Sequence, residues 1–124
     1  MSDQKTDTAQ SEEQQPVPTE WRPVMAKVVA AFAAGDFGLR QGIAGVEPVS
    51  SSTASQVQNY LESYGATLVA LPEETWETSV CIWSGAYWDV LVDLWTSEEG
   101  RSDMVLHAHV ATSGAITVHA VYVP

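Results

Sequence analysis

The sequence predicts an α+β fold in which two N-terminal helices pack on one face of an antiparallel meander sheet of about five strands. Up to residue 64 the apolar side chains recur every three or four residues, as on one face of a helix. From residue 67 onward they alternate with polar side chains, as in half-buried strands. The turns between the alternating segments are too short for parallel crossovers, so successive strands must be antiparallel.

The chain divides near residue 19. Residues 1–18 are polar, rich in glutamine and free of aromatic side chains. We expect them to form a disordered tail, because such a segment buries too little apolar surface to offset its ordering entropy. Residues 19–124 are predicted to form a single domain, and about 100 residues can bury a core without disulfides or metal ions.

Two helices are expected before the sheet. The first begins at Thr19, which can cap free backbone N–H groups, and stops at Gly35. The second begins at Ser51 or Ser52. Residues 36–50 connect the helices, and connections of this length are often functional.

Five segments have the alternation of strands, and they comprise residues 67–71, 77–84, 87–96, 103–112 and 115–123. In the third and fourth segments the even-numbered side chains from 88 to 94 and from 104 to 110 are apolar. These should face the helices, and the odd-numbered side chains should face away. Because paired residues of neighbouring strands lie on the same face of the sheet, even-numbered residues of one segment should pair with even-numbered residues of the other.

One register of this parity brings all three histidines of the chain together. It places Val92 opposite Leu106, Asp89 opposite His109, and His109 opposite His119. The sheet face away from the helices is then expected to carry Asp89, Asp93, His107, His109 and His119 among Trp83, Tyr87 and Trp95.

This cluster supports three interpretations. A His-x-His pair with a third histidine and a carboxylate suits zinc or another transition metal, with His107, His109, His119 and Asp89 as ligands. Paired histidine and aspartate also suit acid–base chemistry such as hydrolysis. The third interpretation is a half-solvated sheet face with ordinary His–Asp contacts.

The loop at residues 97–102 is acidic and carries one arginine. Gly100 suits a turn position with positive φ, and Arg101 can pair with the carboxylate of Glu98, Glu99 or Asp103. Turn structure accounts for every residue type in the loop. An exposed arginine in acidic surroundings is also typical of recognition.

The net charge of −11 restricts the expected partners. Nucleic acid and anionic membranes are excluded, because few basic side chains are present to neutralise phosphates, whereas a basic protein or a cation would be attracted. No apolar run approaches the roughly 20 residues of a membrane span. Cys81 is the single cysteine, so no internal disulfide can form, and without a signal peptide we expect a cytoplasmic location.

Five motifs resemble a small bacterial domain family of unknown function. They are Trp-x-Pro at 21–23, Tyr-Gly-x-x-Leu at 64–68, Leu-Pro-x-x-x-Trp at 71–76, Trp-x-Val-Leu-Val-Asp-Leu-x-Thr-x-Glu-Glu-Gly-Arg-Ser-Asp at 88–103, and Val-Tyr-Val-Pro at 121–124. The resemblance covers about residues 20–124 and implies one domain. It implies no activity, cofactor or catalytic residue.

Our leading hypothesis is therefore a non-catalytic acidic binding protein that needs no cofactor. Its partner would be a protein, in an immunity-type role a basic one, or a second copy of the chain. The residues expected to bind that partner are Glu98, Glu99, Arg101, Trp83, Trp95 and Tyr87. The alternative hypothesis is a metal-binding or hydrolytic domain that uses the His/Asp cluster.

Overall fold

The computed structural model describes residues 8–124 and confirms the α+β class. The strands form one antiparallel sheet in the order β1-β2-β3-β4-β5. They are β1 (Gln15–Pro16), β2 (Val80–Trp83), β3 (Trp88–Thr96), β4 (Gly100–Val110) and β5 (Ile116–Tyr122). The helices are α1 (Arg22–Ala33) and α2 (Ser51–Tyr64), with short 3-10 helices η1 (Thr19–Trp21) and η2 (Glu73–Glu77).

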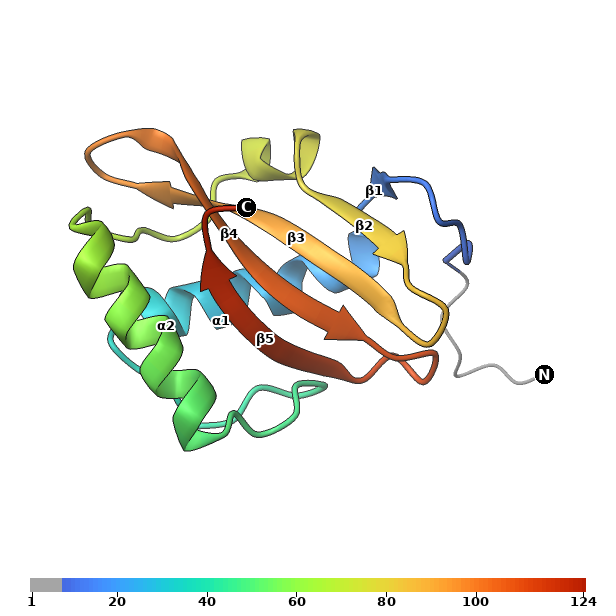
Figure 1. The fold of residues 1–124 in the computed structure, drawn as a ribbon, viewed down its shortest axis with the longest axis horizontal. Helices are drawn as coiled ribbons and strands as arrows, with labels where there is room; N and C mark the ends of the chain where they lie inside the picture. Colours follow the sequence, from blue (N-terminus) through green and yellow to red (C-terminus); the bar gives the residue numbers. More distant parts are fainter. Residues whose placement is uncertain (1–7) are drawn as a thin grey trace.

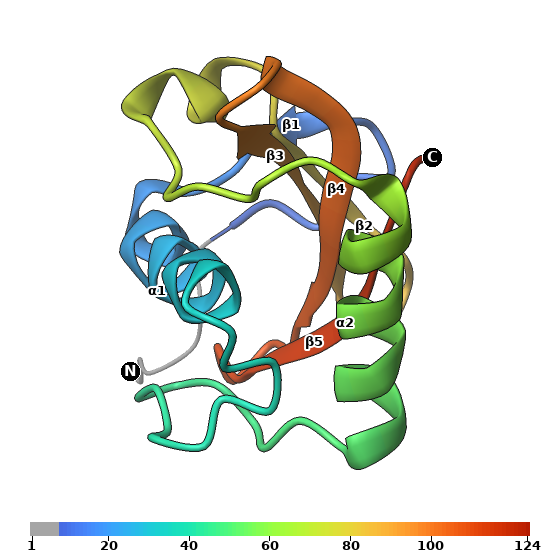
Figure 2. The ribbon, with the colours of Figure 1, turned by 90° about the vertical axis from the view of Figure 1, so that its left-hand side faces the viewer.

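The core lies between α1 and one face of the sheet (Figures 1 and 2). The apolar stripe of α1, from Met25 to Phe32, contributes four side chains that are at most 2 % exposed. Facing them, the even-numbered side chains from 88 to 94 and from 104 to 110 are at most 1 % exposed. Val92 lies opposite Leu106. The predicted alternation of β3 and β4 is therefore confirmed.

The second helix, α2, runs beside the edge strand β5 (Figures 1 and 2) and adds Val57 and Leu61 to the same core. The Gln56 side-chain amide group donates to the Val121 carbonyl at 2.7 Å, and the Gln56 side-chain oxygen accepts from the Val121 N–H at 3.1 Å. Gln56 thereby satisfies backbone groups that an edge strand would otherwise leave open to another chain.

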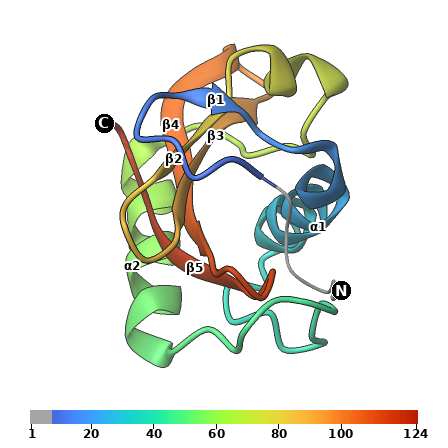
Figure 3. The same cartoon turned by 90° about the vertical axis from the view of Figure 1, so that its right-hand side faces the viewer.

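The N-terminal segment differs from the predicted disordered tail. Residues 1–7 lie outside the described residues, but residues 8–18 pack against the domain. β1 pairs with β2 at the edge of the sheet remote from β5 (Figure 3), and Val17 is fully buried. The indole N–H of Trp88 donates to the Ala9 carbonyl at 2.9 Å. Order in this segment comes from tertiary partners that its own composition does not reveal.

Two smaller expectations are also wrong. Residues 67–71 do not form a strand: Leu68 makes one isolated bridge to Thr96, and the chain then enters η2. The cap of α2 is Ser50, one residue before the predicted serines, and its hydroxyl accepts from the Thr53 N–H at 3.2 Å.

Two glutamates hold the β3–β4 loop against the end of α2. Glu98 accepts hydrogen bonds from the Thr67 backbone N–H at 2.7 Å and from the Thr67 hydroxyl at 2.9 Å. Glu99 accepts from the Tyr64 hydroxyl at 2.9 and 3.0 Å. Gly100 has the predicted positive φ, 75°. The bonds from Thr67 lower the pKa of Glu98 below its ordinary value of 4.5.

We expect Glu98→Gln to destabilise the protein more at pH 7 than at about pH 3. Because the folded pKa is lowered, the stability contributed by ionised Glu98 is present above pH 4.5 and is lost as the pH falls through the folded pKa. Urea unfolding followed by tryptophan fluorescence measures the difference. Glu77→Gln is the control, since this exposed carboxylate accepts no hydrogen bond from residues 8–124. An equal loss at both pH values would contradict the assignment.

Candidate metal centre

The sheet face away from α1, which we call the open face, carries the odd-numbered side chains of β3 and β4. Asp89 lies opposite His109 on this face, as predicted, and Leu91 lies opposite His107. The open face is not fully solvated, because Val105 is only 5 % exposed there although it lies outside the main core cluster. Polar groups on this face are therefore partly desolvated.

A β-bulge in β5 displaces the third histidine from its predicted position. His109 pairs with Thr117 and His107 pairs with Ala120, so His119 is the extra residue between these pairs. The predicted pairing of His109 with His119 is wrong, because alternation alone cannot reveal an inserted residue.

The three histidines nevertheless gather. The ring centroid of His119 lies 4.8 Å from that of His107 and 4.7 Å from that of His109, and the last two are 5.1 Å apart. Asp89 Oδ1 lies 2.7 Å from His107 Nε2 and 3.3 Å from His109 Nε2. The predicted constellation of Asp89, His107, His109 and His119 thus shares one surface.

Within this cluster, Asp89, His107 and His109 form a set that can hold a metal ion. Each offers one ligand atom, and these atoms lie within 4.8 Å of one another. The side chains of Asp89, His107 and His109 are 28 %, 16 % and 23 % exposed, so each is accessible yet partly desolvated. His119 is exposed and stacks on His109 outside this set.

The two ligand separations that involve Asp89 can be compared with those of a tetrahedral site, and one of them requires an adjustment. A metal ion 2.0–2.2 Å from its ligands needs ligand atoms about 3.3 Å apart. The separation of Asp89 Oδ1 and His109 Nε2, 3.3 Å, already meets this requirement. The 2.7 Å separation of Asp89 Oδ1 and His107 Nε2 is that of a hydrogen bond, which would have to open by about 0.6 Å.

The bulge also brings Tyr122 to the cluster. It reverses the alternation of β5, so that Val121 is buried and Tyr122 reaches the open face. The Tyr122 hydroxyl lies 2.8 Å from His107 Nδ1. In neutral His107, the Nε2–H donates to Asp89 and the tyrosine O–H donates to Nδ1. Both ring nitrogens have partners, which fixes the orientation of the imidazole.

The surroundings of His109 favour its neutral form. Burial lowers the pKa of His109 below 6.5, and His119 and His107 lower it further, while Asp89 opposes them. The Tyr87 ring lies against the imidazole, with the ring centroids 4.1 Å apart. A neutral imidazole has a free lone pair, which is the form that binds a metal.

One residue predicted on the open face lies elsewhere. Trp83 packs edge-on against Trp88 on the core side of β2, with ring centroids 4.7 Å apart. The four-residue turn between these tryptophans puts odd-numbered residues of β2 opposite even-numbered residues of β3, and Cys81 opposite Val90 is fully buried. Parity across a hairpin depends on the turn length, which strand alternation does not fix.

The other residues expected to bind a partner lie at two places, the β3–β4 loop with the residues beside it, and Tyr87 next to His109. The carboxylates of Glu98 and Glu99 are engaged by Thr67 and Tyr64. Arg101 is exposed and has no ion pair with residues 8–124. Trp95 lies opposite Arg101, whereas Tyr87 lies on His109. The buried indole nitrogen of Trp95 has no hydrogen-bond partner within the described chain.

No curated protein and no solved structure matches this chain. A family model described as a domain of unknown function, DUF7668, matches residues 29–124. This range contains α2, β2 to β5 and every side chain of the His/Asp cluster, whereas β1 and the first turns of α1 precede it. The expected membership in a small family of unknown function is confirmed, and the chain belongs to the DUF7668 family.

Proposed function

We propose that this protein binds a divalent transition-metal ion such as Zn²⁺ through Asp89, His107 and His109. The observation that carries the proposal is the convergence of one carboxylate and two imidazoles within 4.8 Å. Imidazole and carboxylate are ligands that zinc and similar metals accept. They project from β3 and β4, two strands joined by a continuous ladder on both sides of Asp89, so the ligands are held by a rigid backbone.

Charge and hydrogen bonding also support a cation at this position. The chain carries a net charge of −11, which attracts cations to its surface. A metal ion would replace the proton between Asp89 Oδ1 and His107 Nε2. The His107 proton would then reside on Nδ1 and be donated to the Tyr122 hydroxyl, which is the outer hydrogen bond that orients metal-bound imidazoles.

The fourth ligand determines what such a site can do. If His119 turns toward the metal, four protein ligands close the site and its role is structural. If water takes that position, the metal lowers the pKa of the water toward about 7 and supplies a hydroxide for hydrolysis. His119→Ala separates these roles, because it weakens metal binding in the first case and leaves the affinity unchanged in the second.

Zn²⁺ should bind with one-to-one stoichiometry and raise the melting temperature. Asp89→Asn should weaken binding more than about 100-fold, since even outer hydrogen-bond partners contribute about 10- to 100-fold to affinity. Calorimetric titration with Zn²⁺ measures this, and Co²⁺ absorption reports the ligands. The control is Asp103→Asn, an exposed carboxylate of β4 that should be dispensable. Absence of stoichiometric binding, or unaltered binding by Asp89→Asn, would contradict the proposal.

Tyr122→Phe should weaken zinc binding by about tenfold, because His107 loses the acceptor of its Nδ1–H. The same titration measures the effect. Tyr87→Phe is a matched control: its ring still stacks on His109, and its hydroxyl makes no hydrogen bond with residues 8–124. If both tyrosine variants bind zinc like the wild type, Tyr122 does not orient a metal ligand.

Binding of a basic protein partner without catalysis is our second proposal, and the net charge of −11 supports it. Glu98 and Glu99 are exposed although each accepts hydrogen bonds within the chain, whereas Trp83 packs on the core side. A pull-down from the native host at low ionic strength tests this role. Failure to capture any basic partner would contradict it.

Neither helix of residues 8–124 has the length and apolar content of a membrane span.

The proposed cytoplasmic location rests on the single cysteine, Cys81, a free and buried thiol. Burial raises the pKa of Cys81 to about 11, so the thiol is unreactive. Fractionation of host cells tests the location, and recovery outside the cytoplasm would contradict it.

A further inference from the structure

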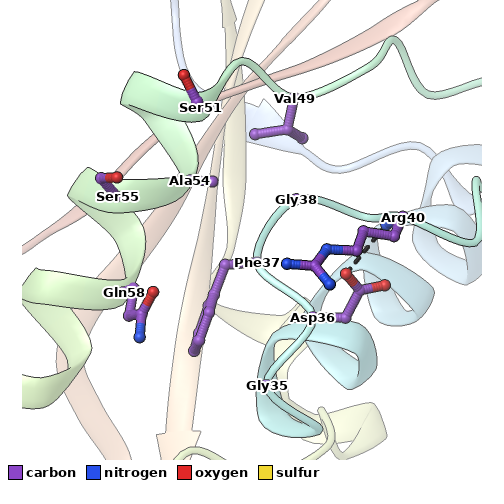
Figure 4. Close-up of a pocket in the computed structure, with 10 residues that line it drawn as sticks. All are labelled: Gly35, Asp36, Phe37, Gly38, Arg40, Val49, Ser51, Ala54, Ser55 and Gln58. Atoms are coloured by element: carbon purple, nitrogen blue, oxygen red, sulfur yellow. Dashed lines mark hydrogen bonds between the residues drawn. The ribbon is translucent and has the colours of Figure 1, made fainter.

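A cavity of about 560 Å³ lies between the connection that follows α1 and the first turns of α2 (Figure 4). Its volume is within the range of about 300–1,000 Å³ that small-molecule sites occupy. One wall is the loop of residues 35–40. The other wall is a single face of α2, formed by Ser51, Ala54, Ser55 and Gln58. This cavity lies apart from the His/Asp cluster and shares no residue with it.

The cavity presents unpaired hydrogen-bond donors. The guanidinium of Arg40 is directed toward Phe37 and the space in front of α2 (Figure 4). Ion pairs among residues 8–124 involve only histidines, so Arg40 has no carboxylate partner there. The hydroxyls of Ser51 and Ser55 likewise make no hydrogen bond within the described residues. Arg40, Ser51 and Ser55 are all exposed, so a ligand that binds their donors would replace water.

Apolar side chains complete the lining and anchor the loop. Phe37 and Val49 line the cavity and pack against the hydrophobic core. The Phe37 ring stacks on Phe32 of α1, with centroids 6.1 Å apart and planes at 30°. Leu39, in the same loop, is 7 % exposed and has a φ of 51°, a left-handed conformation that L-residues adopt at a cost. Burial of Leu39 and partial burial of Phe37 anchor the loop that carries the exposed Arg40.

We propose that this cavity binds a small organic monocarboxylate. The planar fork of Arg40 would pair with the carboxylate, the serine hydroxyls would donate to it, and its apolar body would lie on Phe37 and Val49. Asp36, in the same lining, accepts a hydrogen bond from the Arg40 backbone N–H at 3.0 Å. Its carboxylate offsets part of the charge of Arg40 and repels a dianion such as phosphate more strongly than a monocarboxylate.

Phenylacetate is a suitable probe, with phenylacetamide as its neutral isostere. Titration of the ¹⁵N-labelled full chain, followed by backbone amide shifts, should show saturable changes confined to residues 35–40 and 51–58. Phenylacetamide should bind about tenfold more weakly, because it lacks the charge that Arg40 pairs with. Inorganic phosphate should bind more weakly than phenylacetate.

Arg40→Gln should weaken phenylacetate binding about tenfold, and Arg40→Lys should restore part of the loss, because lysine keeps the charge without the fork. Arg101→Gln, which removes an exposed arginine of β4, should bind phenylacetate like the wild type. Equal affinities for phenylacetate and phenylacetamide in the wild-type protein would overturn the proposal even if a variant failed to fold. Unsaturable shifts, tighter phosphate binding, or full binding by folded Arg40→Gln would overturn it too.

Discussion

The pairing of β3 with β4 determines which side chains are available for function. Burial of the even-numbered side chains from 88 to 94 and from 104 to 110 fixes the parity of both strands. A slip of one residue would turn Asp89, His107 and His109 toward α1 and expose the apolar set. Desolvating an unpaired carboxylate costs several kcal/mol, and exposing a large apolar side chain costs roughly 1.5–3 kcal/mol. The hydrophobic core therefore enforces the position of the polar cluster on the opposite face.

Much of this arrangement could be predicted from the sequence, because burial and alternation are local properties of a strand. The α+β class, the register of Val92 with Leu106 and the pairing of Asp89 with His109 all follow from apolar periodicity. What periodicity could not predict is where it is interrupted. The bulge at His119 inserts one residue into β5 without a change in composition, and Tyr122 joins the cluster only because of that insertion.

Other differences from the predictions have tertiary causes. Trp83 faces the core because the length of the β2–β3 turn sets the parity of β2. β1 forms because the open edge of β2 and the indole of Trp88 offer hydrogen-bond partners to a segment with few apolar residues of its own. The acidic loop after β3 is explained by docking, since Glu98 and Glu99 attach it to the end of α2. The charge pattern of this loop is compatible with both a turn and a recognition loop.

The most direct measurement of the shared face is a nuclear Overhauser spectrum of the histidine and tyrosine ring protons in the metal-free protein. We expect cross-peaks from the ring of His119 to those of both His107 and His109, and from the Tyr122 ring to His107. Ring contacts of His119 confined to its own strand would mean that the bulge does not gather these side chains. That result would contradict the shared open face, and His119 would then be unable to serve as a fourth metal ligand.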